Sequence, residues 1–105
     1  MPREVHIALF VAQHRHSPAD CPALPGRGAQ LLSHISAATA AGYGVTIQSE
    51  ALISQEHVLL LVVEAASREA VERFLALLPS PGDLRILPAC TAEEAIERGG
   101  CEPAL

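Results

Sequence analysis

The stretch Glu4–His14 reads EVHIALFVAQH, and it decides the fold of this chain. Its even-numbered positions form a mixed face that includes Phe10. Its odd-numbered positions are aliphatic and mostly β-branched: Val5, Ile7, Leu9 and Val11. Alternation with a period of two indicates a β-strand. We expect the aliphatic face to pack on helices, which leaves the mixed face for another partner.

The elements that follow show the same kinds of pattern, bounded by capping residues and turns. They are a helix over about 28–41, a strand over 44–54, a strand from His57 that is apolar on both sides over Val58–Val63, a helix from Ser67 to about Leu78, a short strand over Asp83–Pro88 and a brief C-terminal helix that begins at Thr91. The chain is thus predicted to form one domain over residues 1–105.

This order predicts an α+β fold of the ferredoxin-like β-α-β-β-α-β type, with the first and third strands in the middle of an antiparallel sheet. Both main helices then cover one face of the sheet. The other face carries Phe10 and one side of the Val58–Val63 run, and a single chain provides nothing to cover it. An uncovered apolar face usually marks an interface. We therefore expect a homodimer joined through the sheet faces, which is a dimeric α/β barrel.

Composition argues against several classes of function. The net charge is −5, and aromatic residues make up 3% of the chain. Nucleic-acid binders need clustered cations and often stacking rings, so no nucleic-acid partner is expected. The run Val58–Val63 is far shorter than the ~20 residues of a membrane-spanning helix, and the N-terminus lacks the pattern of a signal peptide. Three widely spaced cysteines do not suggest a disulfide scaffold, so a cytoplasmic protein is expected.

The chemically distinctive segment is HRHSPADCP, residues 14–22. His14 and His16 both have even numbers, so they project to the same side while the strand continues. Cys21 follows one helical turn, which can return its sulfur over the strand end. Two imidazoles and a thiolate suit Zn, Cu or Ni. His57, at the start of the central strand, is a candidate fourth ligand.

Two other interpretations stay open. In the first, these side chains are ordinary strand-end and core residues of a structural or interaction module. In the second, a metal-free pocket that includes Phe10 and Glu50 acts on a small organic molecule, with His14 or His16 as acid–base. A nucleophilic role for Cys21 ranks below binding, because the neighbouring carboxylate of Asp20 disfavours the thiolate.

The chain also resembles a group of small bacterial domains in the dimeric α/β-barrel superfamily. The resemblance lies in the HxHSPxxCP segment at 14–22, in Gln55-Glu56-His57 before the apolar strand, and in the segment 88–95. It implies a ferredoxin-like fold and a pocket between the sheet and a partner, with His14, His16, Cys21 and His57 in it. The superfamily includes monooxygenases, isomerases, haem-handling enzymes and metal-responsive proteins, so the resemblance implies no single activity.

Overall fold

A four-stranded antiparallel sheet organises the computed structural model, which describes residues 7–101. The strand order is β2-β3-β1-β4, so the predicted central pairing of the first and third strands is confirmed. The strands are β1 (Ala8–Arg15), β2 (Val45–Ile53), β3 (Val58–Ala65) and β4 (Asp83–Ala89). The predicted beginning of the first strand, at Glu4–His6, lies outside the described residues.

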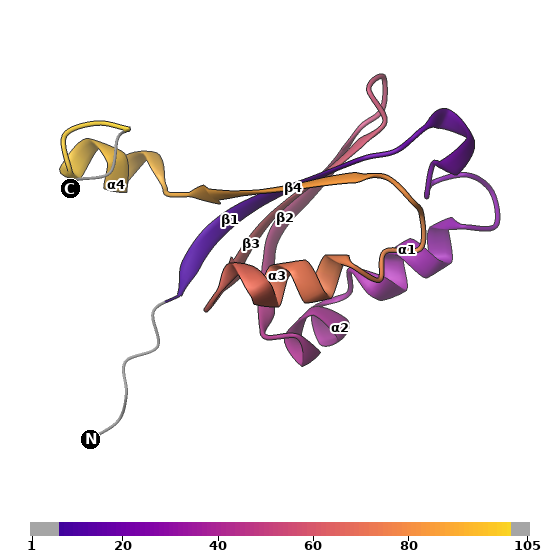
Figure 1. Cartoon of the computed structure of the whole chain (residues 1–105), viewed down its shortest axis with the longest axis horizontal. Helices are drawn as coiled ribbons and strands as arrows, with labels where there is room; N and C mark the ends of the chain where they lie inside the picture. The colour runs from indigo at the N-terminus through magenta and orange to yellow at the C-terminus, as the bar shows by residue number, and fades with distance from the viewer. Residues whose placement is uncertain (1–6, 102–105) are drawn as a thin grey trace.

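Three helices lie on one side of this sheet: α1 (Gly28–His34), α2 (Ala37–Gly42) and α3 (Arg68–Leu75) (Figure 1). The protein is therefore an α+β domain. A single 3-10 turn, η1 (Pro18–Asp20), follows β1, and α4 (Ala92–Glu97) projects past the end of β4 (Figure 1). Within residues 7–101, no helix has the length and apolar character needed to cross a bilayer.

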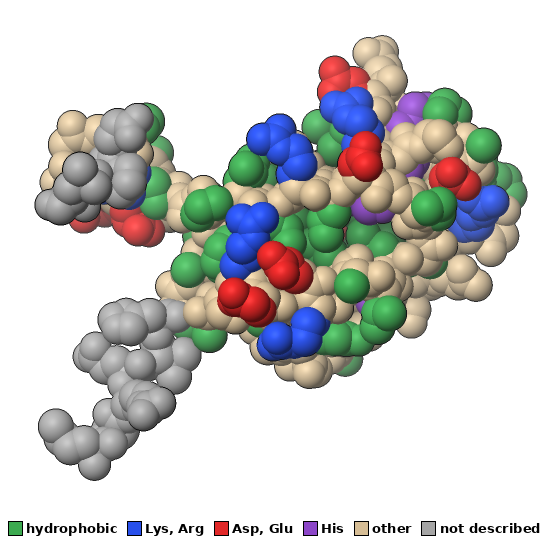
Figure 2. Space-filling model, viewed as in Figure 1, with side chains coloured by type: hydrophobic (Ala, Val, Ile, Leu, Met, Phe, Trp, Pro, Cys, Tyr) green, Lys and Arg blue, Asp and Glu red, His purple; other side chains and the backbone are tan. Residues whose placement is uncertain are grey.

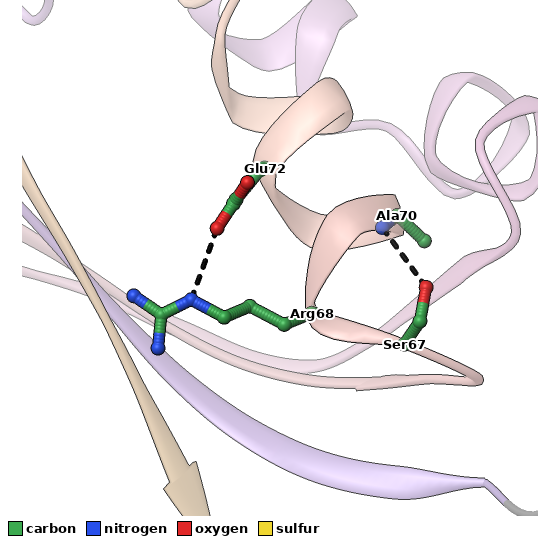
Figure 3. Close-up of polar contacts among 4 residues, drawn as sticks. All are labelled: Ser67, Arg68, Ala70 and Glu72. Carbon is green, nitrogen blue, oxygen red and sulfur yellow. Dashed lines mark hydrogen bonds and ion pairs between the residues drawn. The ribbon is translucent and has the colours of Figure 1, made fainter.

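Helix α3 forms as its sequence predicts. The Ser67 hydroxyl accepts a hydrogen bond from the Ala70 N–H at 3.2 Å and so caps the first turn (Figure 3). On the solvent side, Arg68 Nε donates to Glu72 Oε1 at 3.0 Å (Figure 3). The residues that face the sheet recur at helical spacing and are buried: Ala70, Val71, Phe74 and Leu75.

The face of β1 that packs on the helices is opposite to the predicted one. Phe10 and Ala12 are 7% and 2% exposed and belong to the hydrophobic core. Leu9 and Val11, by contrast, are half-buried on the side away from the helices. Alternation shows which residues share a face. It did not show which face meets the helices, because both faces of β1 are apolar.

The face without helices is therefore formed by the odd-numbered residues of β1 and their neighbours. Val11 of β1 pairs with Val62 of β3 and with Leu87 of β4. Two residues further along β1, Gln13 pairs with Leu60 of β3. Val11, Val62, Leu87 and Leu60 are all half-buried. We call the set Leu9, Val11, Leu60, Val62 and Leu87 the open face.

The predicted helix over 28–41 is two helices. The Ser36 backbone is extended and its hydroxyl accepts a hydrogen bond from the Thr39 N–H at 3.2 Å, which begins α2 anew. Serine competes well for such a capping position. After the break, Ala40 of α2 is fully buried, whereas Leu32 of α1 is 62% exposed.

A register shift between Ile47 and Ser49 divides β2 into two parts. Before it, Ile47 lies opposite Val63, which faces the helices; after it, the even-numbered residues take that side, and Glu50 lies opposite Leu61. Residues 45 and 47 therefore face the helices and residues 51 and 53 the opposite side, so one simple alternation does not describe the strand predicted over 44–54. Glu50 lies on the helix side of the sheet, and its side chain is exposed.

Candidate metal centre

The end of β1 places two histidines on the same side of the sheet. The ring centroids of His14 and His16 are 5.7 Å apart, and the rings are stacked with 30° between their planes. The His16 N–H donates to the His57 carbonyl at 3.0 Å, which continues the pairing of β1 with β3 beyond Arg15 and Val58. The backbone thus brings His57, the residue directly before β3, beside His16.

His57 occupies a strained position at the tip of the β2–β3 hairpin. Its φ is 54°, and within residues 7–101 it is the one non-glycine residue with a positive φ. The left-handed region costs an L-residue roughly 1–2 kcal/mol. In this conformation the His57 ring lies 5.6 Å from the His16 ring, centroid to centroid, with 75° between their planes.

Cys21 returns to the strand end because η1 turns the chain back. The Ser17 hydroxyl accepts a hydrogen bond from the Asp20 N–H at 3.3 Å, and Pro18 takes the first helical position. The Cys21 N–H then donates to the Pro18 carbonyl at 3.4 Å. Pro22, which is fully buried, anchors the chain immediately after the cysteine.

These three segments form a group that could hold a metal ion. One ligand atom from each of His16, Cys21 and His57 lies within 4.8 Å of the other two. In a tetrahedral site with metal–ligand bonds of about 2.0–2.3 Å, neighbouring donors are roughly 3.3–3.6 Å apart. Side-chain rotations that move donors by about 1 Å would close the site. Figure 2 shows histidine side chains at the end of the molecule away from α4.

The electrostatics of this group favour neutral imidazoles. Burial lowers the pKa of His16, and its neighbours His14 and His57 lower it further, against smaller opposing effects of the His14 backbone and of Asp20. Burial also lowers the pKa of His14, and the backbone at Ser80 opposes that shift. Neutral imidazole is the form that coordinates metal ions.

His14 of β1 and His16, directly after β1, both contain buried nitrogens without a partner among residues 7–101. His16 is 5% exposed, and neither of its ring nitrogens has a hydrogen-bond partner among residues 7–101. His14 is 6% exposed, and its Nδ1 is likewise unpaired within that range. Buried polar atoms in folded proteins nearly always have a partner. The end of β1 is therefore an exception that needs an explanation.

The other predicted site residues lie elsewhere. His14 is adjacent to the group of three donors but is not a member of it. Phe10 is in the hydrophobic core rather than at a ligand pocket, and Glu50 is exposed on β2. The two remaining cysteines, Cys90 and Cys101, border a separate cavity of about 560 Å³ between β4 and α4.

The loop before β4, Pro79-Ser80-Pro81-Gly82, has a sequence that indicates only a turn, but it packs against His14. A Cβ atom on Gly82 would lie 2.7 Å from His14 Nε2, so the absence of a side chain lets the loop pack against this ring. The Ser80 hydroxyl is buried and unpaired within the described chain. Nothing in the segment Pro79-Ser80-Pro81-Gly82 pointed to His14, because the contact joins residues more than sixty positions apart.

Comparison of the chain with protein-family models, with curated proteins and with solved structures finds no match. The resemblance to dimeric α/β-barrel domains thus stays a prediction. The site itself consists of two imidazoles and a thiol that lie together at one end of the sheet.

Proposed function

We propose that this protein binds a transition-metal ion through His16, Cys21 and His57. The observation that carries the proposal is His16, an imidazole that is 5% exposed and has both nitrogens unpaired within residues 7–101. Each buried polar group without a partner costs about 1–3 kcal/mol. A metal ion bound to one nitrogen removes one of these costs, and the other two donors are already within 4.8 Å.

The donor types narrow the choice of metal. A thiolate and two imidazoles are soft-to-borderline ligands, which suit Zn, Cu or Ni. Mg²⁺ and Ca²⁺ prefer oxygen ligands, and the group contains none. Cys21 binds as the thiolate and must therefore stay reduced, which fits a cytoplasmic location.

A metal ion at this position would join three segments that are separate in the sequence: the end of β1, the turn after η1 and the hairpin tip before β3. A ligand that binds only the folded state stabilises it by mass action, by about 2.7 kcal/mol when its free concentration is a hundred times Kd. Metal binding and folding stability are therefore expected to rise together.

Metal analysis of untagged protein, followed by Zn(II) titration calorimetry, tests the proposal. Cys21→Ser and His57→Asn should each lower the affinity at least a hundredfold; asparagine suits position 57 because it tolerates a positive φ. Cys101→Ser is the matched control, because Cys101 lies outside the donor group and is exposed. No Zn, Cu or Ni binding at micromolar concentration and neutral pH would refute the proposal, as would equal affinities for Cys21→Ser and Cys101→Ser.

We also propose that two chains pair through the open face into a ferredoxin-like, dimeric α/β barrel. The support is the row of half-buried aliphatic side chains on the side of the sheet away from α1, α2 and α3. Sheets with such faces pack about 10 Å apart with interdigitated side chains. Sedimentation velocity should show a dimer that Val62→Arg dissociates, whereas Gln30→Arg, at an exposed position of α1 on the other side of the sheet, should not affect it. A wild-type monomer at high concentration would exclude this pairing.

A further inference from the structure

The proposed metal site has fewer donors than a closed metal site needs. Within residues 7–101 the group consists of two imidazoles and one thiol. Structural zinc sites have four protein ligands, whereas sites with three protein ligands keep the fourth position for water or another molecule. A tetrahedral metal ion bound to these three donors would therefore have one further coordination position to fill.

His14 is the nearest further imidazole, but its arrangement does not suit the fourth position. Its ring is stacked on that of His16 with only 30° between the planes, whereas His57 meets His16 edge to face. Two stacked rings do not direct their in-plane nitrogen lone pairs at a common point. The Gly82 backbone also lies against the Nε2 and Cε1 edge of His14 and restricts its rotation.

A shallow cavity of about 390 Å³, wide open to solvent, borders the site on the side of His16. Its lining comes from the end of β1, from η1 and from the loop before β4: Arg15, His16, Ser17, Asp20, Pro81, Gly82 and Asp83. His16, the buried and unpaired imidazole, thus forms part of the wall.

The polar groups of the cavity indicate which ligand would fit. Ser17 Oγ donates to Asp20 Oδ2 at 2.9 Å, and a carboxylate can accept further hydrogen bonds at its other oxygen. The Cys21 thiolate and the carboxylates of Asp20 and Asp83 carry three negative charges, and the Arg15 guanidinium carries one positive charge. A divalent metal ion therefore leaves this region with no net charge. The cavity thus has no electrostatic reason to attract an anion, and Asp20 favours a ligand that carries an N–H or O–H.

We propose that the bound metal keeps one coordination position toward this cavity, and that the position takes water or a small neutral nitrogen donor that hydrogen-bonds to Asp20. This inference rests on the proposed metal site. It goes beyond it because a metal with an exchangeable ligand can bind or polarise a small molecule, whereas a closed site only holds the fold together.

Ligand titration of the Co(II)-loaded protein tests the open position. A thiolate-to-cobalt charge-transfer band reports Cys21, and the visible d–d bands report the remaining ligands. Imidazole should change the d–d bands along a saturable curve, and azide should bind about tenfold more weakly because of the nearby carboxylates. Asp20→Asn should tighten azide binding about tenfold. Glu50→Gln, an exposed carboxylate outside the cavity, should change neither affinity.

The possible failures are distinguishable. If the charge-transfer band is present but neither imidazole nor azide changes the d–d bands, the open position is refuted and the metal site remains. X-ray absorption of the wild-type Co(II) protein gives a second measurement: two histidine ligands support the open position, and three would make His14 the fourth ligand and overturn it. If no charge-transfer band forms, both the metal site and this inference fail.

Discussion

The substitution Gly82→Ala tests the close approach of Gly82 to His14 and to the backbone of β1. An ideal Cβ on Gly82 would clash with the Arg15 carbonyl and would lie 2.7 and 2.8 Å from His14 Nε2 and Cε1. The histidine edge could rotate, but the carbonyl belongs to β1, whose Arg15 pairs with Asp83 of β4. Because a backbone atom must move, we expect a cost near the upper end of the 1–3 kcal/mol range for overpacking.

Urea unfolding followed by circular dichroism measures this cost, and Gly28→Ala is the matched control. A Cβ on Gly28 meets nothing within 4 Å, and alanine in place of glycine within a helix stabilises it by up to ~1 kcal/mol. The two variants should therefore differ by about 2 kcal/mol or more in their free energy of unfolding. If both change stability by the same amount, the close approach of Gly82 to β1 is wrong.

Three further outcomes are expected. Ser67→Ala should lower the free energy of unfolding by about 1 kcal/mol, whereas Thr91→Ala should hardly change it, because Ser67 caps a helix packed on the core and Thr91 caps the projecting α4. In the metal-free protein, His57→Gly should be more stable than His57→Ala by about 1 kcal/mol, and both should lose Zn(II) binding; a more stable alanine variant would contradict the backbone strain. The metal-free protein should be less stable at pH 5 than at pH 7.5. The pKa values of His14 and His16 are lowered on folding, so the unfolded chain takes up protons first as pH falls and the stability present above about pH 6.5 is lost. Urea midpoints that rise toward acid pH would refute this sign.

Periodicity was sufficient to predict the four strands and α3, because each depends on a pattern within a short segment, but it did not separate α1 from α2. The central strand pairing follows from the order of the elements. Periodicity did not predict which face of β1 packs on the helices. Leu9 and Val11 are as apolar as Phe10 and Ala12, and only the packing of the helices against the sheet decides which pair is buried. Alternation also failed in β2, where one extra residue near Ser49 exchanges the two faces.

Part of the candidate site could be predicted for the same local reasons. The shared side of His14 and His16 follows from the strand period, and the return of Cys21 follows from the Ser-Pro cap. The approach of His57 depends on the antiparallel register of β1 with β3, which no local pattern contains. The contact of Gly82 with His14 likewise exists only once β4 has paired with β1.

The departures from ordinary packing are concentrated at one end of the molecule. Around α3, the cap, the buried stripe and the surface ion pair all agree with the fold. At the end of β1, His16 is buried without a partner among residues 7–101, and His57 takes a left-handed conformation. Gly82 lies so close to His14 that a Cβ atom would not fit between them. Natural sequences tend to break local rules at functional sites and satisfy them elsewhere. A core histidine alone would explain one such departure. The proposed metal ion on His16, Cys21 and His57 would explain why the unpaired imidazole and the strained one lie side by side.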